Sequence, residues 1–146
     1  MLVIEALRKV IKRMHYPLEV MLICVRWYAA YPLSLRHIEE MMAERGVFVD
    51  HATVHRWAIK ILPILATVFR RHKRPLRQSK YLNNIVEQGH RAIKRIVRPM
   101  MGFKAFRCAR IILAGIETMH MIKKGQLQRP KVKALSAASQ FYSLAF

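Results

Sequence analysis

Two histidines, His51 and His55, stand four residues apart, the spacing that places two ligands on one face of a helix. In helical zinc peptidases the residue after the first histidine is a glutamate that acts as general base, whereas Ala52 stands there in this chain. The sequence shows no evident third ligand, although a zinc site needs at least three protein ligands. We therefore expect no metal at this pair and no cofactor of the chain's own.

Residues 51–62 predict a helix whose outer face could bind DNA. Val54, Trp57 and Ile61 recur at i, i+3 and i+7, so they are expected to face inward. The other side chains are mostly hydrogen-bonding or cationic, as contacts to base edges and phosphates require. The residues expected to contact DNA are His51, Thr53, His55, Arg56 and Lys60. An ordinary helical bundle with a polar outer face is the alternative that this spacing leaves open.

Two preceding helices are expected to position this one. Apolar residues at three- and four-residue spacing predict a helix from Pro17 to Tyr31, which Pro32 ends. Ser34 is a good N-cap for a second helix over 35–45, and Gly46 stands where a left-handed residue after the helix is favoured.

A short connection, 47–49, leads to Asp50, which we expect to cap the helix that begins at His51. Three helices with a tight turn between the last two predict a helix-turn-helix. In that motif the N-terminal part of the last helix enters the major groove.

The net charge of +19 is unevenly distributed along the 146 residues. Residues 1–69 hold 9 Lys and Arg against 6 acids, whereas residues 70–146 hold 18 against 2. Such an excess predicts a polyanionic partner, and nucleic acid is the usual one because each neutralised phosphate releases counterions. A general basic RNA- or ribosome-binding surface stays open. A membrane is disfavoured, because no helix pairs a broad apolar face with a purely cationic one.

Residues 70–80 are basic, contain Pro75 and have no apolar period, so we interpret them as a linker lying along phosphates. The cations there that are expected to contact DNA are Arg70, Arg71, Lys73 and Arg74. A helix is predicted from about 84 to 97, and Arg91, Lys94 and Arg95 on it are further candidate DNA contacts.

Another helix is predicted from about Phe103 to Lys123, with Phe106, Ile111 and Ile116 among its apolar residues; Gly125 ends it. The expected organisation is a helix-turn-helix region over 1–69, the linker over 70–80, a helical region over 81–125 and a tail over 126–146, helical or disordered. The predicted fold class is mainly α.

Two blocks resemble short bacterial transposases of the insertion-sequence-six family. They are RWYAAYPLSLRHIEEMMAERGVFVDHATVHRWAIKILP (26–63) and RQSKYLNNIVEQGHRAIKRIVRPMMGFKAFRCARIILAGIETMHMIKKGQ (77–126). The resemblance covers about 11–126. It implies a helix-turn-helix followed by an RNase H-like domain, whose two Asp and one Glu bind Mg²⁺ for DNA transposition. By motif the Glu corresponds to Glu87, and Lys94 stands seven residues on, where the family carries a basic residue.

The chain departs from that family where the chemistry would be performed. Metal-assisted phosphoryl transfer needs several carboxylates around ions about 4 Å apart. The chain contains a single Asp, Asp50, and the family's two Asp lie between the two blocks, which a few residues join here. Gly89 also stands where the family usually has an Asp. We therefore interpret the chain as the product of an internal deletion that removed the sheet and both Asp.

The expected function is that of a catalytically inactive, transposase-derived protein that binds double-stranded DNA, for instance terminal inverted repeats. Its expected partners include itself or an intact transposase, but no membrane, and its expected place is the cytoplasm, on the nucleoid. A product without function and a general basic nucleic-acid-binding protein are the alternatives. The C-terminal apolar residues Ile93, Ile111 and Ile116 could pack on each other, on the N-terminal helices or on a second chain, or the C-terminal half could be loosely folded.

Overall fold

A computed structural model describes residues 2–12, 15–72, 91–100, 105–127 and 136–146, and within these ranges it contains helices and no β-strand. The named elements are α1 (Leu2–Ile11), α2 (Leu18–Ala30), α3 (Leu35–Glu44), α4 (His51–Arg71), η1 (Arg98–Met100), α6 (Phe106–Lys123) and α7 (Ala137–Ser143). Residues 91–97 are also helical. The predicted mainly α fold class is confirmed.

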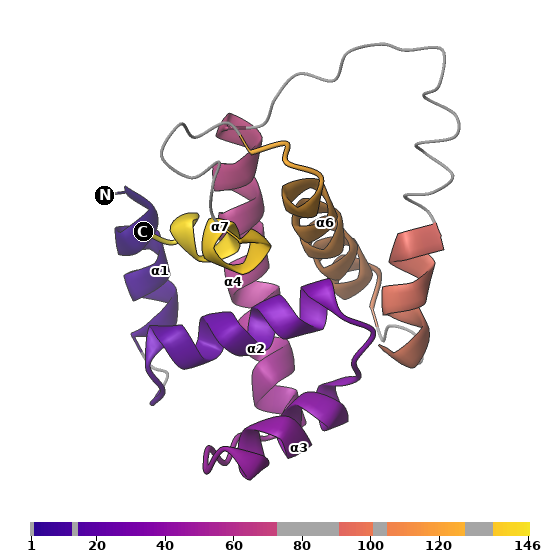
Figure 1. Ribbon diagram of the computed structural model, residues 1–146. Helices are drawn as coiled ribbons and strands as arrows, with labels where there is room; N and C mark the ends of the chain where they lie inside the picture. The colour runs from indigo at the N-terminus through magenta and orange to yellow at the C-terminus, as the bar shows by residue number, and fades with distance from the viewer. Residues whose placement is uncertain (1, 13–14, 73–90, 101–104, 128–135) are drawn as a thin grey trace.

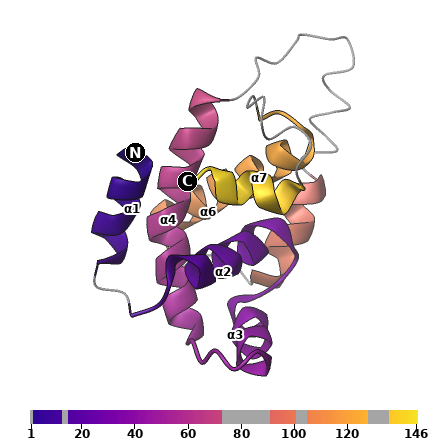
Figure 2. The ribbon, with the colours of Figure 1, turned by 60° about the vertical axis from the view of Figure 1, so that its left-hand side comes forward.

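Helix α4 is the central element, because α1, α2, α3 and α6 all pack against it. α1 and α6 flank α4, α2 crosses it, and α3 lies at its N-terminal end (Figures 1 and 2). Trp57, Leu65 and Phe69 of α4 are almost completely buried. Burial of each such side chain contributes about 1.5–3 kcal/mol, so the core is built around this helix.

Helix α4 is longer than predicted, since it continues past Pro63 to Arg71. A proline inside a helix removes one backbone hydrogen bond and costs about 3 kcal/mol or more. Pro63 itself is exposed, whereas Leu62, Leu65 and Phe69 are buried around it. Apolar burial on both sides of the proline therefore offsets the lost bond and keeps the helix continuous.

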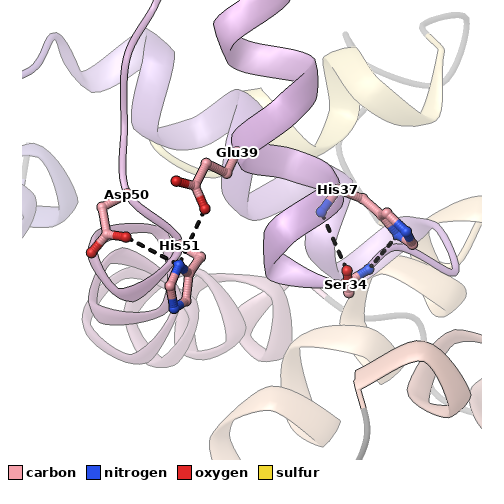
Figure 3. A network of polar contacts seen from close by, with 5 residues as sticks. All are labelled: Ser34, His37, Glu39, Asp50 and His51. Carbon is pink, nitrogen blue, oxygen red and sulfur yellow. Dashed lines mark hydrogen bonds and ion pairs between the residues drawn. The ribbon is translucent and has the colours of Figure 1, made fainter.

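The ends of α3 agree with the sequence. The backbone N–H of His37 donates to Ser34 Oγ at 3.2 Å, and the backbone N–H of Ser34 donates to His37 Nδ1 at 3.1 Å (Figure 3). This reciprocal pair satisfies two backbone donors at the start of α3. Gly46 has φ 77°, which a residue with a side chain rarely adopts, so the predicted left-handed end of α3 is confirmed.

Helix α1 was not expected from the sequence. Its Leu7 side chain is completely buried in the core. The cations Arg8, Lys9 and Lys12, in its last turn or just after it, are exposed. Its amphipathic character lets it pack along α4, and this packing places its cations beside that helix.

The C-terminal helices complete the core of the N-terminal ones. Ile116 is fully buried between α6 and its neighbours, while Ile93 and Ile111 are partly buried against the same core. Because α6 packs on α4 and α2, the N-terminal helices are a partner of its buried side chains. Phe106 is an exception to the predicted apolar face, because at the first turn of α6 it projects to solvent and is 86% exposed.

Helix α7 lies in the region where the sequence left order or disorder open, and it packs on α6 and α2. Phe141 and Leu144 are buried there. Arg26 Nε of α2 donates to Tyr142 Oη at 2.8 Å, which joins the end of the chain to the N-terminal helices.

Length and composition would allow α4 to cross a membrane, with a mean hydropathy of 1.2 over its most apolar window. Half of that window is buried inside the protein, as in the core helix of a helical bundle.

The two cysteines should differ sharply in reactivity. Both are free, Cys24 is buried in α2, and burial raises the pKa of its thiol from 9.0 to about 11. Because the thiolate is the reactive form, iodoacetamide at pH 8 should alkylate the partly exposed Cys108 first. Mass spectrometry should find Cys24 modified only after denaturant is added. Equal rates at both thiols in the folded protein would contradict this packing of α2.

The same shift predicts a pH dependence of stability. The unfolded chain releases the Cys24 proton near pH 9, whereas the folded chain keeps it until about pH 11. The unfolded state thus binds fewer protons in this window, so the free energy of unfolding contributed by Cys24 falls as pH rises from 9 to 11.

Candidate nucleic-acid interface

The turn between α3 and α4 is held from two directions. The backbone N–H of Val47 donates to the carbonyl of Met42 at 2.9 Å, which closes the end of α3. Tyr16 Oη donates to the carbonyl of Phe48 at 2.7 Å, and the Tyr16 ring meets Trp57 edge-to-face at 5.1 Å. The connection before α4 is therefore anchored to the segment that follows α1 and to the core.

Asp50 and His51 at the start of α4 do not lie as the sequence suggested. Asp50 precedes α4, but its side chain makes no capping hydrogen bond to the helix. His51 Nδ1 instead lies 3.0 Å from Asp50 Oδ1 and 3.1 Å from Glu39 Oε2 of α3 (Figure 3). The side-chain cap is thus replaced by a contact that joins α3 to α4 through His51.

This cluster of Glu39, Asp50 and His51 is also the group of donors in the described ranges that could hold a metal ion. One ligand atom from each residue lies within 4.8 Å of the others. Asp50 is exposed and the other two side chains are half-buried, and hydrogen bonding between His51 and the carboxylates accounts for their approach. His51 therefore joins α3 to α4 with a carboxylate on either side of its Nδ1 atom.

Thr53, Arg56 and Lys60 share one solvent-facing side of the first two to three turns of α4. Arg56 and Lys60 are exposed, and Arg56 Nη2 donates to Thr53 Oγ1 at 3.2 Å. All three line an open groove with a volume of about 1060 Å³. His51 and His55 are half-buried and do not line it. The structure thus gathers three of the five predicted contacts on this helix.

The other predicted contacts lie elsewhere. Arg70 and Arg71 are exposed in the last turn of α4 rather than in a linker. At 1.5 Å per residue, Arg70 is about 21 Å along the helix from Arg56. Arg91, Lys94 and Arg95 are exposed on the helical segment 91–97, which lies on the side of α6 away from α1 (Figure 1). Lys73, Arg74 and Glu87 lie outside the described residues.

Three cations that the sequence analysis did not single out join the groove. Lys9 and Lys12 come from α1 and its end, and Arg107 comes from the first turn of α6. The alternation of basic and apolar residues in 1–12 carried a signal for an amphipathic helix with a basic side. Nothing local marks Arg107, because its position depends on the packing of α6 against α4.

Comparison with known proteins gives these features a family context. A family model described as a DDE domain matches residues 27–126, which is more than half of the chain. The chain belongs to the DDE transposase family. The matched range contains almost all of both sequence blocks described above. It includes all of α3, α4 and α6 and the last turn of α2.

The related proteins are transposases of insertion sequences. The transposase for insertion sequence-like element IS431mec of Staphylococcus aureus is 42% identical over 57 residues, 38% of this chain and 25% of that protein. The transposase for insertion sequence element IS257 in transposon Tn4003 of Staphylococcus aureus is 40% identical over 57 residues, which again are 38% of this chain and 25% of that protein. These relatives place the chain in the insertion-sequence-six family. No solved structure matches the chain.

Each match spans only a quarter of the relative's length. The family uses a divalent metal ion held by carboxylates. Few carboxylates are available to such an ion in this sequence. The only Asp, Asp50, is in contact with His51, and the acids of the basic region 70–146 are Glu87 and Glu117. This inventory does not fit a two-metal site.

Proposed function

We propose that this chain binds double-stranded DNA through the N-terminal half of α4 and does not cut it. The observation that carries the proposal is the side of α4 formed by Thr53, Arg56 and Lys60, directly after the anchored turn from α3. In a helix-turn-helix this is the part of the second helix that enters the major groove. Membership of the DDE transposase family, whose members act on DNA, supports the same partner.

The chemistry of the side chains supports contacts to both bases and backbone. An arginine donates two parallel hydrogen bonds to a guanine edge, and a threonine contacts bases through its hydroxyl or methyl group. The hydrogen bond from Arg56 to Thr53 holds the guanidinium over the helix surface, which limits the freedom it would lose on binding. Lys60, one turn further, would meet a phosphate as a point charge.

The proposed inactivity is supported by the carboxylate content of the sequence, which includes a single Asp. We propose that the chain binds chromosomal DNA in the cytoplasm, on the nucleoid. The proposed target sequences are the ends of the parent insertion sequence. A chain that occupies such an end, alone or in a mixed dimer with an intact transposase, would block the productive complex. A general polycation and a product without function are the competing interpretations.

Arg56→Ala tests the proposal. The free energy of binding to a duplex with the parent element's terminal repeat should weaken by about 1–3 kcal/mol, roughly 5- to 150-fold in affinity, with less loss on a scrambled duplex. Binding is measured by fluorescence anisotropy across a salt series. Lys124→Ala, which removes one exposed cation beyond the groove, is the control and should bind like the parent protein.

Equal affinity of the parent protein for both duplexes, with a steep salt dependence, would leave only a polycation and contradict sequence reading by α4.

A further inference from the structure

The groove beside α4 has a second wall built from elements outside the helix-turn-helix. Its lining combines the basic end of α1, the connection at His15 and Tyr16, the outer side of α4 and the start of α6. Its fully charged members are Lys9, Lys12, Arg56, Lys60 and Arg107. No acidic residue belongs to this lining.

We propose that this groove holds the phosphate backbone of DNA beside the base-reading part of α4, with Lys9, Lys12 and Arg107 as backbone contacts. The proposal rests on the proposed function. It adds phosphate contacts from α1 and α6 to the contacts that α4 makes. A helix-turn-helix alone does not require such a contact from α6.

The charge of the groove is the first argument. Like charges gathered around one open space repel each other, and the carboxylates of Glu39 and Asp50 are turned to His51 instead. A bound polyanion removes that repulsion and releases counterions in proportion to the phosphates neutralised.

The shape of the groove is the second argument. It is open, about 1060 Å³ in volume, and its cations come from three separate elements. One small anion offers a single charge centre to these cations, whereas a strand presents a row of phosphates about 3.4 Å apart along the duplex axis. A strand backbone is therefore the occupant that the arrangement favours over a free phosphate.

The third argument concerns Tyr16, which holds one side of the groove in place against α4. Tyr16 lies in this lining and is fixed at both ends, by its hydrogen bond to the Phe48 carbonyl and by its ring contact with Trp57. Lys9 and Lys12 lie in the same lining as Tyr16, Thr53 and Arg56, so the groove joins them to the side of α4 that follows this turn. Phosphate contacts on both sides of a helix fix its orientation in the groove of DNA, although they carry no sequence information.

Two variants test the inference, Lys9→Ala/Lys12→Ala and Arg107→Ala. Each should weaken binding to the terminal-repeat duplex and to the scrambled duplex by the same factor, so the preference between them stays unchanged. The slope of log affinity against log salt should become shallower by about 1 for Arg107→Ala and about 2 for the double variant. Circular dichroism and the thermal midpoint verify that each variant is folded.

Lys124→Ala is again the matched control, because Lys124 follows the other end of α6 and should leave the salt slope unchanged. If both groove variants bind like this control while Arg56→Ala loses sequence preference, the groove inference fails and the proposed function stands. If the parent protein binds no duplex, both fail. Displacement of the duplex by inorganic phosphate at constant ionic strength would identify a small-anion site and overturn the inference.

Discussion

Replacing Gly115 with valine should lower the free energy of unfolding by about 1–3 kcal/mol, the usual cost of overpacking a core. Gly115 is buried on the side of α6 that meets α4. A Cβ atom there would lie 2.6 and 2.8 Å from the two Cδ atoms of Leu62 and 3.0 Å from its Cγ. Leu62 is 2% exposed, so it has little room to move away.

Urea denaturation followed by circular dichroism measures this effect. Ala109→Val, at a partly exposed position of the same helix, is the control for a valine that has room, and it should cost only a few tenths of a kcal/mol to about 1 kcal/mol. Helix propensity does not explain a larger loss at position 115, because valine has a higher propensity than glycine. Leu62→Ala alone should cost about 2–5 kcal/mol, because it leaves a cavity. The double variant Leu62→Ala/Gly115→Val should be less destabilised than the sum of both, since the valine occupies part of that cavity.

An unchanged midpoint for Gly115→Val would show that α6 is not docked on α4. That result would favour the loosely folded C-terminal half that the sequence left open. It would also remove Arg107 from the groove, because only the docking of α6 brings this residue beside α4. The test of packing is thus a test of how the proposed DNA-binding surface is assembled.

Features set by neighbours in sequence were predicted well. Ser34 caps α3 because its hydroxyl reaches the backbone three residues on, and Gly46 follows because it tolerates φ 77°. Val54, Trp57 and Ile61 are buried as their spacing indicated. Such features depend on local geometry, which a sequence specifies directly.

Features set by tertiary contacts were not predicted. Burial of Leu65 and Phe69 extends α4 beyond Pro63, and no local rule shows that these residues have a partner. Asp50 has a residue type suited to capping, yet the neighbouring His51 competes for its carboxylate. Arg107 joins the groove only because α6 packs on α4. The sequence therefore predicted only the part of the candidate interface that lies on α4. The structure added the parts from α1 and α6.

The second large effect is expected in catalysis. The purified protein should not cleave a terminal-repeat duplex in Mg²⁺ or Mn²⁺, whereas an intact relative such as the IS431mec transposase, on its own element ends, serves as the positive control. Enzymes accelerate such reactions by at least about 10⁶-fold, and two-metal catalysis needs carboxylates converging on both ions. Asp50, the only aspartate of the sequence, is engaged at the start of α4 by His51.

Glu87→Ala distinguishes a protein that does not cleave DNA from one that cleaves it slowly. By resemblance, Glu87 is the remaining member of the family's catalytic triad. The family's two aspartates have no counterpart in this sequence, which contains Asp50 alone, so we expect this variant to bind DNA and fail to cleave it, as we expect of the parent protein. Metal-dependent nicking by the parent protein that disappears in Glu87→Ala would reverse this conclusion. It would mean that carboxylates of a second chain or of another element complete the site.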